Sequence, residues 1–327
     1  MTTAPQDQTR KEYQAPPPPT GHNSIMSEPL KAQTARDYTE RVLRVLVHIQ
    51  NHLDEELSLD DLAAIARFSP FHFHRVFRGM VGESVNEHVR RLRLERAAHR
   101  LKFSDEQVIR LALDAGYEAH ESFTRAFAAM FGVSPSEFRK THRAVPYPPS
   151  PSNVHFVAGG DLQSFEPLSP GEKVMDVKIE KIPATRVAFI RHIGPYDQVG
   201  AAWGRLMSWA GPRGLLGPSM RIFGLCYSDP DVTPPEKVQY DACLVVGPNV
   251  QPEGDIGVQD VDGGEFAVAV HHGSYSKLGE TYGMLCGQWL PSSGRQLGPP
   301  PCIERYLNNP QFTPEDKLVT EVCMKLA

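Results

Sequence analysis

Apolar residues recur at intervals of three and four through residues 36–143, as they do on the buried face of a helix. Serine and proline start signals and glycine stop signals divide this stretch into segments. They predict seven helices, at about 36–52, 59–66, 70–81, 85–101, 106–114, 120–131 and 135–141. The preceding residues 1–35 contain Pro16 to Pro19 and few apolar side chains, so a disordered tail is expected there.

Two segments of the helical half are nearly the same. The stretch from Ser69 to Gly82 reappears fifty positions later, from Ala119 to Gly132. Each copy carries an apolar stripe at i, i+3, i+4 and i+7, which is Phe73, Val76, Phe77 and Met80 in the first and Phe123, Ala126, Phe127 and Met130 in the second. Such a stripe faces its own core. A repeated two-helix unit indicates a tandem helix-turn-helix domain, joined by the predicted helix 85–101.

Local signals support these helix boundaries. Ser58, Ser104 and Ser134 each precede an acidic or amide residue by three positions, as in a capping box. Ser69 precedes Pro70, which suits the first helical position because its missing N–H costs nothing there. Gly82 and Gly132 stand where the repeated helices are expected to end.

The second half changes to the alternating pattern of strands, first in Met175–Lys181. It also contains a repeat, in which the segment from His192 to Leu206 is echoed from His271 to Leu285. Each copy predicts strand, strand, helix, strand and strand, and hence a pseudo-twofold α+β sandwich over 174–327 with a pocket between its halves. A proline-rich linker, expected to be extended and semi-rigid, is predicted over 144–173.

Composition places the chain among soluble globular proteins, because its 327 residues are 40% hydrophobic and 22% charged. No apolar segment resembles a signal peptide or a membrane span, so a cytoplasmic location without membrane contact is expected. The net charge is −5, but residues 36–143 carry roughly 17 basic against 16 acidic residues and residues 144–327 roughly 14 against 20. Five widely spaced cysteines without a C-x-x-C pair predict buried thiols and no zinc site.

Once the apolar stripe of each repeated helix faces inward, a polar set is left to face outward. In the first helix this set is Phe71, His72, His74, Arg75 and Arg78, and in the second it is His120, Glu121, Ser122, Thr124 and Arg125. Several of these residue types contact base edges or phosphates when a helix lies in the major groove. The histidines suit packing or phosphate contact as well as base contact, and Glu121 would accept a hydrogen bond from cytosine but repel phosphate.

Residues 36–143 resemble the AraC/XylS family of transcriptional regulators, through Gly116-Tyr117, Phe123–Phe127 and Phe131–Arg139. The resemblance implies a homeodomain-like pair of helix-turn-helix units that insert their second helices into successive major grooves of double-stranded DNA. It assigns base contacts to Phe71, His74, Arg75, His120, Glu121 and Arg125, of which Arg75 is the strongest candidate. Because the two polar sets differ, an asymmetric operator bound by a single chain is expected.

Residues 174–327 resemble the GyrI-like small-molecule-binding family, and the domain order resembles the Rob subgroup of regulators. The motifs that carry the resemblance are His192–Tyr196, Tyr240–Cys243, Gly264–Gly273, Trp289–Pro291, Ile303–Tyr306 and Val319–Val322. The resemblance implies a cleft for bulky cationic or aromatic compounds with an acidic residue at its base. Glu304 fits that role, since a cation would compensate a buried carboxylate. The other effector-site candidates are Trp203, Tyr227, Tyr282, Tyr306 and Glu321.

Other interpretations of these residues remain open. Trp203 and Trp289 also suit packing of a helix on a sheet, and Glu304 also suits an ion pair with Arg305 or Arg295. Position 323, which is frequently aromatic in the resembled family, is Cys323 here, so the pocket is expected to differ in size or selectivity.

The sequence thus predicts a DNA-binding transcriptional regulator whose second domain binds an effector, with RNA polymerase as a further candidate partner. No catalytic residue, metal or cofactor is assigned, because no nucleotide-binding or nucleophile motif is present and His48 and His52 lack the glutamate of a metalloprotease motif. Two alternatives are a small-molecule hydrolase, in which Glu304 or Glu321 activates water, and a ligand-sequestering or architectural protein.

Overall fold

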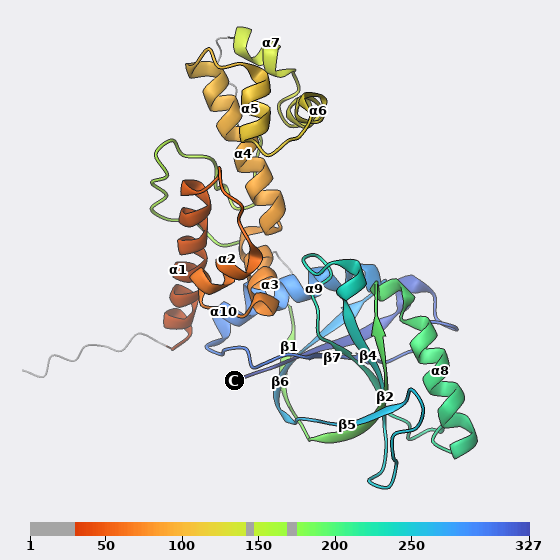
Figure 1. Cartoon of the computed structure of the whole chain (residues 1–327). Coiled ribbons are helices and arrows are strands. Elements are labelled where there is room, and N and C mark those ends of the chain that lie inside the picture. The colour runs from red at the N-terminus through yellow and green to blue at the C-terminus, as the bar shows by residue number, and fades with distance from the viewer. Residues whose placement is uncertain (1–29, 142–146, 169–174) are drawn as a thin grey trace, which may run out of the picture.

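A computed structural model describes residues 30–141, 147–168 and 175–327 (Figure 1). The seven predicted helices are confirmed as α1 Leu30–Asn51, α2 Leu59–Ala66, α3 Pro70–Val81, α4 Val85–Phe103, α5 Val108–Asp114, α6 His120–Phe131 and α7 Pro135–Lys140. Helix α1 extends six residues further toward the N-terminus than expected, so the predicted tail is wrong for residues 30–35. The extension has a tertiary cause, because the start of α1 packs against α10 of the second half. Residues 1–29 lie outside the described residues.

The helix ends follow from their capping residues. Ser58, Ser69 and Ser134 each accept a backbone N–H of the first turn, and Gly82 and Gly132 end α3 and α6 with φ of 84° and 77°. The expected cap at Ser104 is wrong. Ser104 follows the last turn of α4 and bonds Arg100 O, whereas α5 begins two residues later than predicted, after Gln107.

The second half has the predicted order of strand, strand, helix, strand and strand, twice. Its strands are β1 Val177–Ile182, β2 Thr185–Ile193, β3 Ile222–Cys226, β4 Gln239–Val245, β5 Gly257–Val261, β6 Gly264–His272, β7 Cys302–Tyr306 and β8 Val319–Lys325. Helix α8 is Gly200–Ala210, and α9 Leu278–Met284 continues through a π-helical segment, Leu285–Trp289, into α10 Leu290–Ser293. Short 3-10 turns are Tyr196–Gln198, Gly211–Arg213, Pro235–Lys237, Tyr275–Lys277 and Glu315–Lys317.

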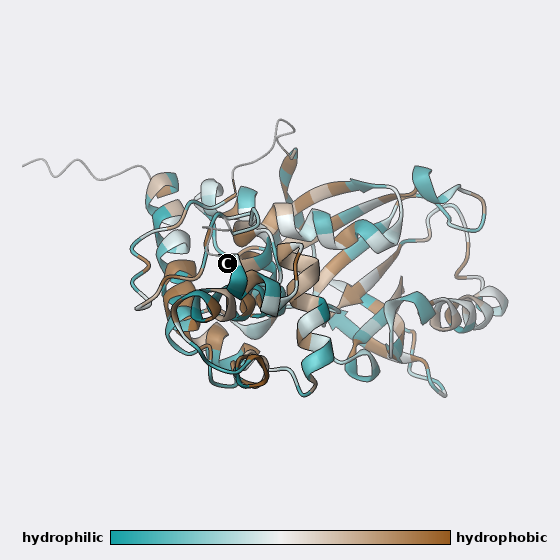
Figure 2. Cartoon of the chain, turned by 90° about the horizontal axis from the view of Figure 1, so that it is seen from above, coloured by the Kyte–Doolittle hydropathy of each residue, from teal (hydrophilic) through white to brown (hydrophobic). Residues whose placement is uncertain are grey.

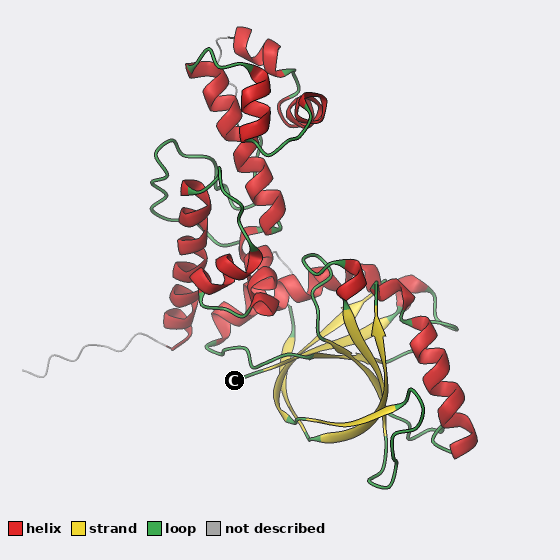
Figure 3. Cartoon of the chain, viewed as in Figure 1, coloured by secondary structure: helices red, strands yellow, loops and turns green. Residues whose placement is uncertain are grey.

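The strands form one curled antiparallel sheet with the order β1-β6-β8-β7-β3-β4-β2-β5 (Figure 3). The strands of the two repeats are interleaved at the edges, since β1 pairs with β6 and β5 pairs with β2. The pseudo-twofold relation passes between β7 and β3, the central pair of the order. The sandwich therefore consists of helices over a single sheet, and Figure 2 shows brown apolar bands recurring along its strands.

Within the described residues, the buried apolar side chains form three clusters. The largest runs from Phe73 and Phe77 of α3 into the helices and one sheet face of the second half. A separate cluster, with Phe123, Phe127 and Phe138 at its centre, belongs to α5, α6, α7 and the end of α4. The third lies on the opposite sheet face. The first helix-turn-helix unit is thus packed with the second half, whereas the second unit has its own core.

The predicted linker is more than a spacer. Within it, residues 147–168 have no helix or strand but lie on the helical half, where Val154 and Phe165 are buried. Gln50 donates to His155 O at 2.7 Å, and the Phe156 N–H donates to Glu95 at 2.7 Å. The expectation of an extended, semi-rigid spacer therefore does not describe this segment, which is packed on the helical half because hydrogen bonds and apolar contacts offset the entropy of ordering it.

All five cysteines are buried free thiols, as predicted. Among the described helices, none combines the length and the apolar character that crossing a membrane requires.

Candidate DNA-binding helices and effector site

Helix α6 presents the polar face that the sequence predicts. Phe123 and Phe127 are fully buried against the second unit's core. On the other side, His120, Glu121 and Arg125 are exposed and Ser122 is half-buried, with Arg125 donating to the Ser122 hydroxyl at 3.3 Å. Nothing in the described chain covers this face, so it is open to a partner.

Helix α3 differs from α6 although its sequence is similar. Phe73, Val76, Phe77 and Met80 are buried as predicted. However, His72, His74 and Arg75 are also buried, with exposed fractions of 9%, 0% and 5%. The expectation that these three side chains face outward is wrong for this structure. The reason is that α9 and the π-helical segment pack against the face of α3 that was expected to point to solvent.

Two acidic side chains of the loop after β3 meet the basic side chains of α3. Asp229 Oδ2 lies 3.2 Å from His74 Nδ1 and 3.7 Å from Arg75 Nε, and Asp231 pairs with Arg78. Burial opposes ionisation of Asp229, but the hydrogen bond with His74 and the charge of Arg75 outweigh it and lower the pKa of Asp229. The loop therefore supplies carboxylates to side chains that were expected to meet phosphates or bases.

This cluster also has the spacing of a metal site. In the described part of the chain, His74, Asp229 and Asp231 are the group whose donor atoms all lie within 4.8 Å of one another. The residues around it do not fit a cation, because Arg75 and Arg78 already pair with the two carboxylates. We interpret the group as an ion-pair cluster between the two halves of the chain.

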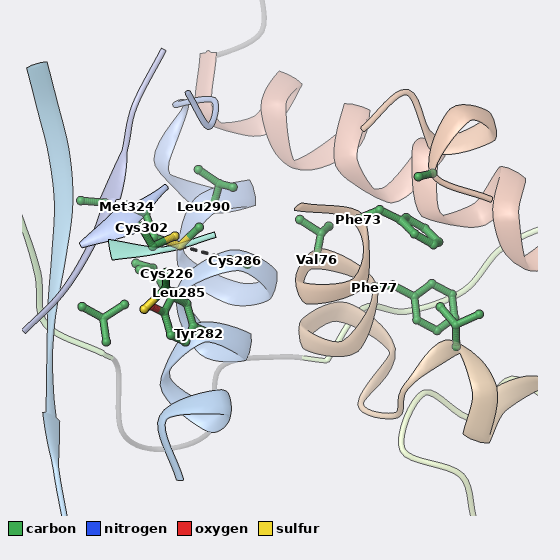
Figure 4. Packing of buried hydrophobic residues seen from close by; sticks show 14 of the residues in the cluster. Phe73, Val76, Phe77, Cys226, Tyr282, Leu285, Cys286, Leu290, Cys302 and Met324 are labelled. Atoms are coloured by element: carbon green, nitrogen blue, oxygen red, sulfur yellow. Dashed lines mark hydrogen bonds between the residues drawn. The ribbon is translucent and has the colours of Figure 1, made fainter. Parts of the chain in front are cut away.

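Helix α3 and the facing helix approach at backbone distance. A Cβ atom on Gly79 would lie 2.2 Å from Gly283 O, and one on Gly287 would lie 2.1 Å from Gly79 C. Only glycine fits such a crossing. Figure 4 shows Val76 pointing from α3 toward the helix that carries Cys286, whereas Phe73 points away from it. The sequence contained a signal for this contact, since a glycine inside a predicted helix calls for a packing reason.

Glu304 lies among three tyrosines, Tyr240, Tyr282 and Tyr306, which we call the tyrosine cluster. Glu304 is 8% exposed, and its carboxylate accepts hydrogen bonds from Tyr282 and Tyr306, each at 2.9 Å. Burial, and next the negative charge of Glu304, raise the pKa of both tyrosine hydroxyls far above the usual range, so both remain protonated donors. The alternative interpretation, an ion pair of Glu304 with Arg305 or Arg295, is not what forms, since Arg305 pairs with Glu180 and Glu321, and Arg295 pairs with Glu265.

The tyrosine cluster contains side chains from both repeats of the second half. Tyr306 shares a hydrogen bond of 2.9 Å with Tyr240, and Trp203 of α8 donates to the Tyr240 hydroxyl at 3.1 Å. The Trp203 and Tyr306 rings meet edge to face at 6.0 Å. Sequence reasoning found Trp203, Tyr282 and Tyr306 but missed Tyr240, which occupies the β4 position whose side chain turns to this face.

Arg75 of α3 lies at the edge of the tyrosine cluster, over Tyr282. Its guanidinium lies 4.1 Å from the Phe71 ring centre and 4.6 Å from that of Tyr282, and it donates to Ser228 O at 3.4 Å. Tyr282 therefore contacts Arg75 through its ring and Glu304 through its hydroxyl.

Comparison with known proteins covers both halves. The family model of the GyrI-like small molecule binding domain matches residues 175–327, and that of a helix-turn-helix domain matches residues 62–141. The transcriptional activator AarP of Providencia stuartii is 39% identical over 98 residues, which are 30% of this chain and 73% of AarP. The chain belongs to the AraC-type helix-turn-helix transcriptional regulators and carries a GyrI-like domain.

Two further relatives match different lengths of this AraC-type regulator. The right origin-binding protein of Escherichia coli (strain K12) is 32% identical over 97 residues, 30% of this chain and 34% of that protein. The probable transcriptional regulator YgiV of the same strain is 29% identical over 156 residues, 47% of this chain and 97% of YgiV. The chain thus matches about a third of the length of the right origin-binding protein.

Two of the predicted effector-site residues, Tyr227 and Glu321, lie on the other sheet face from Glu304. Glu321 is opposite Arg305 in the β7–β8 register and pairs with it at 2.8 Å, so it occupies the other sheet face from Glu304. Tyr227 follows β3 on that same other face and donates to Asp241 at 3.0 Å. Since successive strand residues point to opposite faces, a register unknown from sequence decides this placement.

Proposed function

We propose that the exposed polar face of α6 binds the major groove of an operator in a sequence-specific manner, with Arg125 as its main base contact. The proposal rests on the contrast within this helix, in which Phe123 and Phe127 are fully buried while His120, Glu121 and Arg125 are exposed. A bidentate arginine–guanine pair is the commonest specific contact of such helices. We assign a phosphate contact to Arg90, which is exposed on α4.

The DNA assignment is tested on operator fragments recovered by genomic pull-down with the full chain. Arg125→Ala should weaken binding to them by about 1–3 kcal/mol and relax the preference at one base position. Arg90→Ala should weaken all sequences alike and lower the salt slope by about one. An Arg125→Ala chain that binds specific and random duplexes as the wild type does would refute the assignment.

We further propose that Glu304 and the tyrosine cluster around it form the effector site, and that its ligand is a bulky aromatic cation. Supporting this is the carboxylate of Glu304, which is buried and accepts hydrogen bonds from two tyrosine hydroxyls, and with which no basic side chain of the described residues forms an ion pair. A buried carboxylate without a cation is costly, and aromatic rings add cation–π attraction to a positive ligand. Both features would therefore favour a cation over a neutral compound of the same shape.

Tetraphenylphosphonium and the neutral triphenylphosphine oxide make a suitable pair of probes for calorimetry on the full chain. Glu304→Gln should weaken binding of the cation at least about tenfold, or about 1.4 kcal/mol, and leave the neutral compound unchanged. Glu321→Gln is the matched control, because it removes a strand carboxylate from the other sheet face while Arg305 keeps Glu180. Equal losses in the two variants would contradict the proposed site.

We infer binding without turnover, since both oxygens of Glu304 are held by tyrosine hydroxyls. Incubation of the purified chain with candidate esters and reactive electrophiles checks this. Hydrolysis that disappears in Glu304→Gln would make the second half an enzyme instead.

A further inference from the structure

We infer that the GyrI-like domain holds the first DNA-binding helix in a closed state, with Arg75 as an internal cation beside the effector site, and that a cationic ligand releases this helix to DNA. The inference rests on the proposed function of the Glu304 site. It goes further by coupling that site to α3. Three observations support it. The second half covers the polar face of α3, Arg75 lies over Tyr282 beside the Glu304 site, and α3 crosses the facing helix at glycines.

The second half covers the face of α3 that carries the residues predicted to contact DNA. His74, Arg75 and Arg78 all contact the second half, and two of their partners are the carboxylates of Asp229 and Asp231. Carboxylates paired with the basic side chains of α3 occupy the positions that phosphates or base edges require. In the second copy, Arg125 stands where Arg75 stands in the first and is exposed. The closed state therefore leaves one DNA-binding helix available out of two.

The position of Arg75 couples this cover to the effector site. The guanidinium lies over the Tyr282 ring at 4.6 Å, and the hydroxyl of the same tyrosine bonds Glu304 at 2.9 Å. Arg75 also lies close to Cys302, whose β7 side chain shares a sheet face with Glu304. A ligand cation that binds Glu304 must compete with these hydroxyl bonds and with the charge of Arg75 nearby. Ligand and docked arginine therefore oppose each other, and the opposition is reciprocal.

The glycine crossing shows that α3 is shaped for docking. Gly79 lies inside a helix, where glycine is less stable than alanine, and the second copy has Ala129 at the same position. The three atoms nearest to a Cβ on Gly79 belong to Gly283 and Gly287 of the second half. Glycine at position 79 thus serves the contact between the halves rather than the helix-turn-helix core.

Gly79→Ala is therefore the decisive variant. It should force the halves apart, because its Cβ would overlap backbone atoms, while the helix itself gains stability. Gly204→Ala is the matched control, since a Cβ at this position of α8 meets nothing within 4 Å. The measurement is binding of a random 30-bp duplex by the full chain at several salt concentrations, with circular dichroism to confirm that each variant is folded.

The closed state predicts that Gly79→Ala binds the duplex at least about tenfold more tightly and with a salt slope steeper by about one to two, as Arg75 and Arg78 become available. Gly204→Ala should match the wild type. A folded Gly79→Ala chain with wild-type affinity and slope would overturn the inference.

A second variant keeps the test valid if Gly79→Ala does not fold. Asp229→Asn with Asp231→Asn removes the carboxylates that cover α3 and should raise duplex affinity in the same way. Asp197→Asn with Asp262→Asn controls for the change in net charge, because both positions are exposed in the same half. Equal gains in the two double variants would overturn the inference.

Addition of tetraphenylphosphonium separates this inference from the proposed function. The cation should raise duplex affinity of the wild type but not of Gly79→Ala, and it should bind Gly79→Ala more tightly. Cation binding that depends on Glu304 but leaves duplex affinity unchanged would overturn the coupling and keep the effector site. Tighter duplex binding by Gly79→Ala without any cation binding would keep the closed state and overturn the effector site.

Discussion

Phe127→Ala should unfold the second helix-turn-helix unit alone, whereas Phe77→Ala should weaken the first unit together with the GyrI-like domain. The two phenylalanines are equivalent in the repeat, and both are fully buried. Phe127 belongs to the separate core of the second unit, and Phe77 belongs to the core that both halves share. The same substitution should therefore have different consequences at the two positions.

The magnitudes support this difference. Removing a buried phenylalanine ring costs about 3–5 kcal/mol. The Phe127 ring also loses its pairs with Phe123 at 5.6 Å, Phe131 at 4.5 Å and Phe138 at 5.3 Å. The second unit spans about 45 residues, and at about 0.05–0.15 kcal/mol per residue its own stability is about 2–7 kcal/mol. Its loss is comparable to its stability, while the larger shared core retains a margin.

Amide hydrogen exchange read by mass spectrometry checks the prediction. Phe127→Ala should abolish protection in α5, α6 and α7 and preserve it in α1 and the sheet. Phe77→Ala should lower protection in α1, α3 and α9 together, with α6 unchanged. Uniform loss of protection along the whole chain in Phe127→Ala would refute the division into two cooperative units.

Three further outcomes follow from buried polar groups. Glu95→Gln should cost about 3–5 kcal/mol, because Glu95 is fully buried and holds His155 at 3.0 Å, and residues 147–168 should become sensitive to protease. Asp241→Asn should cost less, about 1.5–3 kcal/mol by urea unfolding, because it weakens the charge-assisted hydrogen bonds that Asp241 accepts from Arg191 and Tyr227, yet it should not alter cation binding because Asp241 lies on the sheet face away from Glu304. Burial, and next Arg75, lower the pKa of His72 from 6.5 to about 4. The unfolded chain therefore binds the proton first, so stability should be complete above about pH 6.5 and fall by up to about 3 kcal/mol toward pH 4, a dependence that His72→Gln should flatten in urea titrations.

The sequence predicted the features that arise locally. Serine caps, terminal glycines and the apolar period located the seven helices, and only the Ser104 cap failed because Ser104 follows a preceding helix instead of starting the next one. The succession of strands and helix along each repeat was also predictable, from the alternation of apolar and polar residues and from the repeat itself. These features depend on neighbours within a few residues, which is the range that such patterns describe.

Features that depend on distant partners were not predictable in the same way. Glu304 and Glu321 are both carboxylates on strands, and the β7–β8 register alone places them on opposite faces. The prediction that the polar face of α3 is exposed depended on the apolar stripe of α3 alone. It took no account of α9 and the π-helical segment, which cover that face. Its interior Gly79 was a signal of close contact, but that signal names no partner.

The two repeated helices differ at the positions that contact the GyrI-like domain. His74, Arg78 and Gly79 of α3 make the ion pairs and the backbone crossing, and the second copy has a threonine and two alanines in their places. Arg75 is instead shared with the second copy, as Arg125. A residue needed only for docking would have no reason to recur in the exposed helix, whereas a DNA-contacting arginine is useful in both. The shared arginine and the unshared contacts together fit a helix that serves DNA and the GyrI-like domain in turn.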